Sequence, residues 1–64
     1  MGQKMIDIYE AIRVEDGMRG QMRLAMKTGI TFATARDVPD TPEKLADFSL
    51  AFKQITNKEC PIKI

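Results

Sequence analysis

Residues 21–38, QMRLAMKTGITFATARDV, are the stretch of sequence that decides the fold. Small and apolar residues stand on both sides of Gly29, which predicts two short helices joined by a tight turn. Gly29 can take the positive φ that such a turn requires without steric cost. Thr31 then acts as an N-cap, because its hydroxyl accepts a hydrogen bond from an amide of the following helix. We therefore predict a second short helix over residues 32–36.

Two alternatives stay open for this stretch. Ile30, Phe32 and Val38 lie at even spacing, which is also the spacing of a short strand. Ala33 and Ala35 favour the helix, and in that helix we expect Phe32 to lie in the core. In the second alternative, the glycine of the turn simply caps a structural helix.

The strongest start signal lies downstream, in the segment VPDTPEK. Asp40 or Thr41 is expected to be the N-cap, and Pro42 suits an early helical position because its missing amide costs nothing there. Glu43 adds a negative charge at the positive end of the helix dipole. These signals predict a helix over residues 42–56. Its buried side is expected to carry Leu45, Phe48, Phe52 and Ile55, with Leu50 on the far side.

A first helix is predicted upstream, over residues 5–14, because apolar residues fall three or four positions apart there. Residues 15–17, Glu-Asp-Gly, interrupt this pattern. Either they form a turn before a helix over residues 18–28, or one helix runs through them to Lys27, since each glycine costs only about 1 kcal/mol. Both arrangements stay open. The buried stripe of the first helix is expected to be Met5, Ile8, Tyr9 and Ile12.

The segment 18–28 has an unusually wide apolar arc, which indicates contacts on two sides. Its methionines recur every four residues, while Leu24 lies well round the helix from them. Flexible thioether side chains suit a surface that repacks against another chain, so we expect a protein interface here. Alternatively, a small helical core surrounds the whole segment. The expected interface residues are Met18, Met22, Met26 and, from the last helix, Leu50.

Three cations also follow this segment, because Arg19, Arg23 and Lys27 recur every four residues. They lie along one side of a helix, where they either form a solvated face or contact phosphates, each contact adding salt-dependent affinity. The whole chain has ten Lys and Arg against nine Asp and Glu, a net charge of +1. That balance creates no strong field to attract nucleic acid or an anionic membrane.

The chain has 64 residues, which is enough for a single domain, residues 1–64, with a small core. Chains of this size are usually stabilised by disulfides, a metal or self-association. Cys60 is the only cysteine and histidine is absent, so neither an internal disulfide nor a zinc or iron–sulfur site is expected. We therefore expect a homo-oligomer. The predicted fold class is all-α, a small bundle of three to four short helices, with residues 59–64 as an extended tail.

We expect no catalysis, no cofactor and no metal. Without histidine, acid–base chemistry would fall to carboxylates, lysines, Tyr9 or Cys60, and none of these sits in a recognisable constellation. The glycines match neither the Walker nor the dinucleotide-binding spacing. Apolar runs are far shorter than the roughly 20 residues that span a bilayer. A lone thiol and no export signal predict a cytoplasmic protein.

Residues 21–38 resemble the helix-turn-helix core of phage and bacterial repressors of the Cro and lambda-repressor type. Ala25 is the small residue where the two helices cross, and Leu24, Ile30 and Val38 occupy the buried positions. The resemblance implies a helix-turn-helix-like core that binds duplex DNA as a dimer, with its second helix in the major groove. It assigns base contacts to Thr31, Ala33, Thr34 and Arg36. In the same hypothesis, the row of Arg19, Arg23 and Lys27 offers the phosphate contacts.

Two functions of different classes follow from these patterns. The first is a small DNA-binding regulator that acts as a dimer through the helix-turn-helix. Its recognition surface is electrostatically poor, because Arg36 is the only cation between Thr31 and Asp40. The second is an oligomerising or accessory helical subunit that binds another chain through its methionines, with no nucleic acid and no catalytic activity.

Overall fold

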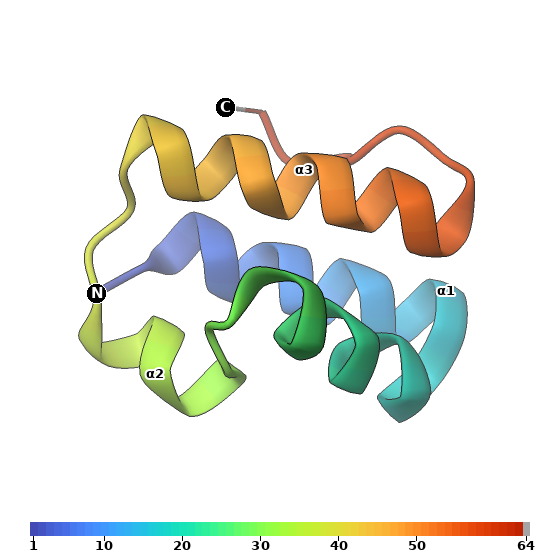
Figure 1. Cartoon of the computed structure of the whole chain (residues 1–64), viewed down its shortest axis with the longest axis horizontal. Helices are drawn as coiled ribbons and strands as arrows, with labels where there is room; N and C mark the ends of the chain where they lie inside the picture. The colour runs from blue at the N-terminus through green and yellow to red at the C-terminus, as the bar shows by residue number, and fades with distance from the viewer. Residues whose placement is uncertain (64) are drawn as a thin grey trace.

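The computed structural model describes residues 1–63, which contain three helices and no strand (Figure 1). Helix α1 spans Gln3–Thr28, α2 spans Phe32–Asp37 and α3 spans Pro42–Thr56. The predicted all-α class is confirmed, and the strand alternative for residues 30–38 is wrong. The last predicted helix is found with the expected bounds.

Helix α1 turns back on itself at Gly17. A straight helix of its 26 residues would be about 39 Å long, whereas the longest dimension of the whole chain is 25 Å. Gly17 has φ 67° and ψ −157°, which is not helical. Figure 1 shows the two parts of α1 running in opposite directions. We call residues 3–16 the first arm of α1 and residues 18–28 its second arm.

The two arms are joined by a polar contact as well as by the core. The side-chain amide of Gln21 donates a hydrogen bond to the carbonyl oxygen of Tyr9, at 3.1 Å. In a straight helix these residues would be separated by about 18 Å. Of the two arrangements that the sequence left open for residues 15–17, the structure has the turn, and helical structure continues directly on both sides of it.

The turn after the second arm has the predicted chemistry. Gly29 is left-handed, with φ 73°, and its amide donates to the carbonyl of Ala25 at 2.8 Å. Thr31 is the N-cap of α2, because its Oγ1 accepts a hydrogen bond from the Thr34 amide at 3.2 Å. The Tyr9 hydroxyl donates to the carbonyl of Ile30, which attaches this turn to the first arm.

Burial raises the pKa of the Tyr9 phenol to about 12, although the hydroxyl of Thr28 opposes the shift. An acid whose pKa is higher in the folded state favours folding while it is neutral. Its contribution is complete below the unfolded value of 10.0 and is lost as the pH rises from there toward 12. Tyr9 is the only tyrosine, so tyrosinate absorbance reports it alone. We expect a titration midpoint near pH 12 in buffer and near pH 10 in denaturant, and equal midpoints would contradict the burial.

The loop between α2 and α3 holds the start of α1. Thr41 is the N-cap of α3, since its Oγ1 accepts from the Lys44 amide at 3.3 Å. Asp40, the other predicted cap, instead accepts from the amides of Lys4 and Met5, at 3.0 and 3.3 Å. It therefore caps the first turn of α1, whose unpaired amides need acceptors. This contact joins segments that are far apart in the sequence.

The core lies between the first arm of α1 and α3, with contributions from the second arm and from α2. Tyr9 is at its centre and makes edge-to-face contacts with Phe48 and Phe32, at ring-centroid distances of 5.7 and 5.6 Å. Phe32 is 36% exposed, so it covers the rim of the core and its predicted place inside the core is wrong. The buried hydrophobic residues are Met5, Ile8, Tyr9, Ile12, Leu24, Ala35, Leu45, Phe48, Ala51 and Phe52.

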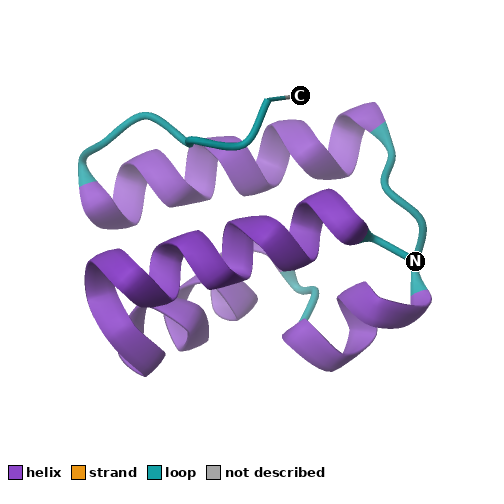
Figure 2. Cartoon of the chain, turned by 180° about the vertical axis from the view of Figure 1, so that it is seen from behind, coloured by secondary structure: helices purple, strands orange, loops and turns teal. Residues whose placement is uncertain are grey.

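The chain leaves α3 at Asn57, which is left-handed with φ 61°. The following residues run back along α3 (Figure 2), and Cys60 and Ile62 pack against the core. Ile64, the last residue of the predicted tail, lies outside the described residues. None of the helices in residues 1–63 is long and apolar enough to cross a membrane.

Candidate interaction surfaces

The methionines of the second arm of α1 face solvent. Met18, Met22 and Met26 are 69%, 67% and 83% exposed, whereas Leu24 on the opposite side of the same arm is fully buried. The alternative in which a small core surrounds this segment is therefore wrong. We call these three residues the methionine row. Exposed apolar residues that gather in one patch, rather than singly, are typical of interaction sites.

The three cations form a second row beside the methionine row. Arg19, Arg23 and Lys27 are all exposed and each directly follows a methionine in the sequence. Within residues 1–63 the ion pairs are Lys53–Glu59 and Lys58–Glu15, so these three cations have no acidic partner there. Lys27 donates a hydrogen bond to the side-chain oxygen of Gln54 on α3, at 3.2 Å. We call Arg19, Arg23 and Lys27 the cation row.

A hollow of about 290 Å³ lies where the second arm of α1 meets the C-terminal half of α3. Its apolar contributions come from Met26 and Ile55, and its polar rim from Arg23, Lys27 and Gln54. Its volume is at the lower end of the range of small-molecule sites, about 300 to 1,000 Å³. It is of a size to take a side chain of another protein. The sequence did not indicate this hollow, because Ile55 was expected to lie on the buried side of α3.

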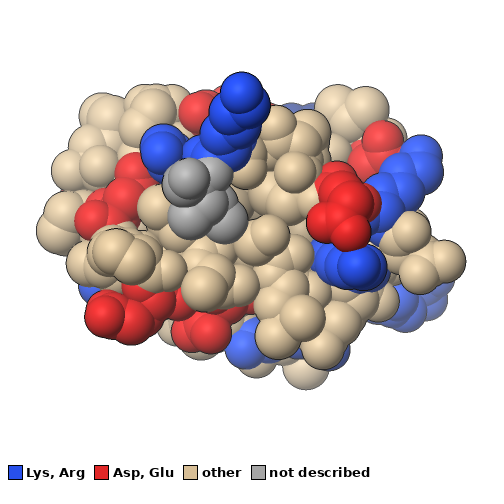
Figure 3. Space-filling model, turned by 90° about the horizontal axis from the view of Figure 1, so that it is seen from above, with Lys and Arg blue, Asp and Glu red and all other residues tan. Residues whose placement is uncertain are grey.

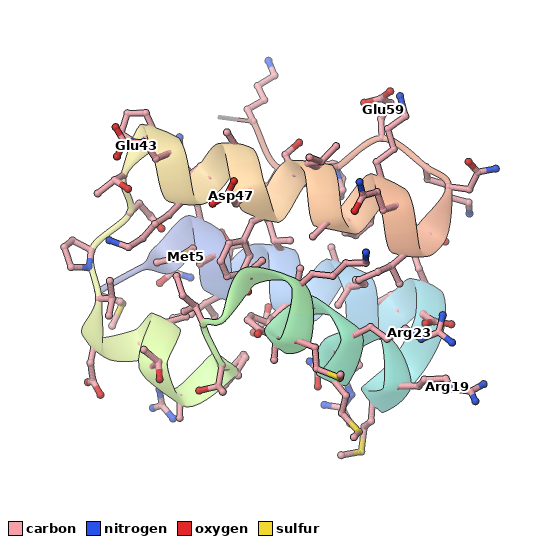
Figure 4. All side chains as sticks on the ribbon, viewed as in Figure 1. Met5, Arg19, Arg23, Glu43, Asp47 and Glu59 are labelled. Carbon is pink, nitrogen blue, oxygen red and sulfur yellow. The ribbon has the colours of Figure 1, made fainter. Side chains whose placement is uncertain are left out.

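An exposed stripe on α3 leads to the same hollow. Glu43, Asp47, Leu50 and Gln54 follow each other at intervals of four, three and four residues, so they share one side of the helix. All four are exposed, and Leu50 is 58% exposed. Gln54 stands at the hollow, whereas Figure 4 shows Glu43 at the opposite end of the molecule from Arg19 and Arg23. We call these four residues the α3 stripe.

Charge on the α3 side is unevenly distributed. Figure 3, which looks onto α3 and the C-terminal segment, shows acidic and basic side chains next to each other in several places, with uncharged surface between these groups. The two carboxylates of the α3 stripe, Glu43 and Asp47, have no ion-pair partner within residues 1–63. The face that contains the cation row and the α3 stripe therefore carries uncompensated positive charge at one end and negative charge at the other.

The residues that the resemblance assigned to base contacts lie on a different part of the molecule. Thr31, Ala33, Thr34 and Arg36 are all exposed. The hydroxyls of Thr31 and Thr34 already bond to each other, at 3.0 Å. Helix α2 has only six residues, a length of about 9 Å. Figure 4 places Arg19 and Arg23 at the other end of the molecule from α2, so the structure does not bring these two cations together with the predicted base-contacting residues.

Metal-ligating groups, a second hollow and the single thiol lie outside these rows. Residues 1–63 contain no group of three or more carboxylates or thiols placed to hold a metal ion. Another hollow, of about 450 Å³, is lined by Glu10, Arg13, Gln21 and Phe32. Cys60 is a free, half-buried thiol.

Comparisons with known proteins identified no relative of this chain. The chain matches no protein-family model, no curated protein and no solved structure at a significant level.

Proposed function

We propose that this chain is an accessory subunit that binds another polypeptide chain through the surface around its methionine row. The observation that carries the proposal is the exposure of Met18, Met22 and Met26, 67–83%, on one side of a well-packed arm. Methionine side chains are flexible and polarisable, which suits surfaces that repack against a partner. Leu50 and the hollow beside Met26 extend the apolar surface onto α3.

Site-specific photo-crosslinking tests the proposal in native host cells. A benzophenone amino acid is placed at Met26 and, as the matched control, at Gln3, which is exposed on the first arm. We expect a discrete higher-mass adduct from position 26 and none from position 3, because only position 26 lies on the binding surface. Charge introduced by Met22→Glu should remove the adduct. No adduct at position 26, or equal adducts at both positions, would contradict the proposal.

A DNA-binding regulator is the second candidate function. The supporting observation is that α2 is capped by Thr31, follows the left-handed Gly29 and leaves Ala33, Thr34 and Arg36 open to solvent. Its weakness is charge, because Asp37 directly follows the one cation of α2. Titration with random duplex DNA at low and then at higher salt tests it. Binding that falls steeply with salt and is weakened by Arg36→Gln supports this function, and no binding at low salt contradicts it.

A further inference from the structure

We infer that the face with the cation row and the α3 stripe binds a second copy of the same chain, related to the first by a two-fold axis. In this dimer, Leu50 of each copy enters the hollow beside Met26 of the other. Asp47 and Glu43 of each copy face the cation row of the other. The inference rests on the proposed function and identifies the occupant of the part of that surface that is formed by Met26, Leu50 and the hollow.

The first support is charge complementarity within one face. The cation row and the acidic end of the α3 stripe have no ion-pair partners within residues 1–63. A two-fold rotation exchanges the two ends of a face, so the positive end of one copy meets the negative end of the other. The same contact is then made twice, which is the self-complementarity that a closed dimer requires.

The second support is the spacing of the charges. Consecutive members of the cation row are four residues apart on a helix, as are Glu43 and Asp47. Both intervals correspond to about 6 Å along a helix axis. Two helices laid side by side therefore place Asp47 and Glu43 of one copy opposite successive cations of the other. Arg23 can bind a carboxylate through two parallel hydrogen bonds.

The third support is the position of the apolar contact. The hollow is lined by Gln54 and Ile55, which follow Leu50 by about one helical turn on α3. If two α3 helices cross antiparallel near residue 52, each Leu50 lies over the hollow of the other copy. Asp47, one turn earlier, then lies toward Arg23, which also lines the hollow. A single crossing thus satisfies the apolar and the charged contacts together.

The size of the face determines how stable the dimer is. The molecule measures 25 × 20 × 17 Å, so its broadest face is small. Stable interfaces bury about 800 Å² on each partner, and this face is at or below that size. We therefore expect a reversible dimer, whose population depends on protein concentration and decreases as salt screens the charge pairs.

Charge reversal in sedimentation equilibrium tests the inference. Arg23→Glu and Asp47→Lys each turn both attractive contacts of the dimer into repulsive ones. We expect each variant alone to raise the dimer dissociation constant by about tenfold or more. Lys63→Glu and Glu10→Lys, exposed positions outside the face, should leave the constant unchanged.

An equimolar mixture of the two charge-reversal variants should dimerise again. In the mixed pair, the glutamate introduced into one chain faces the lysine introduced into the other. The unaltered Asp47 of the first chain likewise faces the unaltered Arg23 of the second. Both contacts are therefore attractive in the mixed dimer, whereas both are repulsive when either variant pairs with itself.

The outcomes separate the inference from the proposed function. We expect both variants to be folded, because both positions are exposed, and circular dichroism checks this. A wild-type chain that stays monomeric, or a mixture that fails to dimerise, would overturn the dimer. If such a chain still crosslinks at position 26 to a different protein, the proposed function is supported and only the claim that the partner is a second copy is wrong. A chain that stays monomeric and gives no adduct would contradict both the proposed function and the dimer.

Discussion

Gly17→Ala should destabilise the protein by about 3 kcal/mol. Gly17 has φ 67° and ψ −157°, a combination that is essentially restricted to glycine. A Cβ atom at this position would meet no other atom within 4 Å, so the cost comes from the backbone alone. Alanine also favours the straight helix that would separate the two arms of α1. Thermal unfolding should show a decrease in Tm of roughly 12 °C or more, given about 4–8 °C per kcal/mol for a small domain.

Gly29→Ala is the matched control for this substitution. Gly29 is also at positive φ, 73°, and also has open space around its Cβ position. Its conformation is the ordinary left-handed one, which costs a residue with a side chain only about 1 kcal/mol. The two glycines therefore differ in backbone conformation and not in packing. Equal losses at both positions would contradict the conformation of Gly17.

Gly2→Ala should lower the free energy of unfolding by a similar amount, for a different reason. Gly2 is buried, and a Cβ atom there would lie 2.6 Å from the carbonyl oxygens of Ala35 and Val38. Movement of the Ala35 carbonyl is restricted, because it accepts the amide of Gly2 at 2.9 Å. Crowding of this kind typically costs 1–3 kcal/mol, and two backbone contacts place the expected value at about 3 kcal/mol.

Denaturant unfolding measures this loss. The control is Gln3→Ala, one residue away, whose exposed side chain should change stability by no more than about 0.5 kcal/mol. A Gly2→Ala variant as stable as this control would mean that the N-terminus does not pack against α2.

Local chemistry made most of the helices predictable. Thr31, Thr41 and Pro42 act through hydrogen bonds and backbone limits that involve only the next few residues, and each stands where the sequence placed it. Asp40 differs, because it accepts amides from the start of α1, 35 and 36 residues away in the sequence. The sequence offered Asp40 only as a local cap, since nothing nearby indicates a partner at that distance.

The turn at Gly17 was left open for the same physical reason. Glycine tolerates both a helix and a turn, and the choice is made by contacts between the arms, such as that of Gln21 with the carbonyl of Tyr9. Phe32, in contrast, was predicted wrongly. Its apolar character suggested burial, but α2 has only six residues and contacts the core through Ala35, which leaves the larger ring at the rim.

The candidate face was predictable in part. Regular spacing revealed the methionine row and the cation row, because both lie on a single helix. Their relation to Glu43 and Asp47 could not be found, since it depends on the second arm folding back beside α3. Leu24 of the second arm packs in the same core as Phe52 of α3, and the hydrogen bond between Lys27 and Gln54 connects the two helices at the surface.

The distance between the two arms of α1 tests the central claim, which is that the chain turns back at Gly17 and so directs the methionine row outward. Double electron–electron resonance measures this distance directly. The spin labels are attached to a chain that carries both Gln3→Cys and Met26→Cys in a Cys60→Ser background. We expect a single separation below the 25 Å length of the molecule. A continuous helix would give about 35 Å, and a distribution centred there would contradict the fold and the face derived from it.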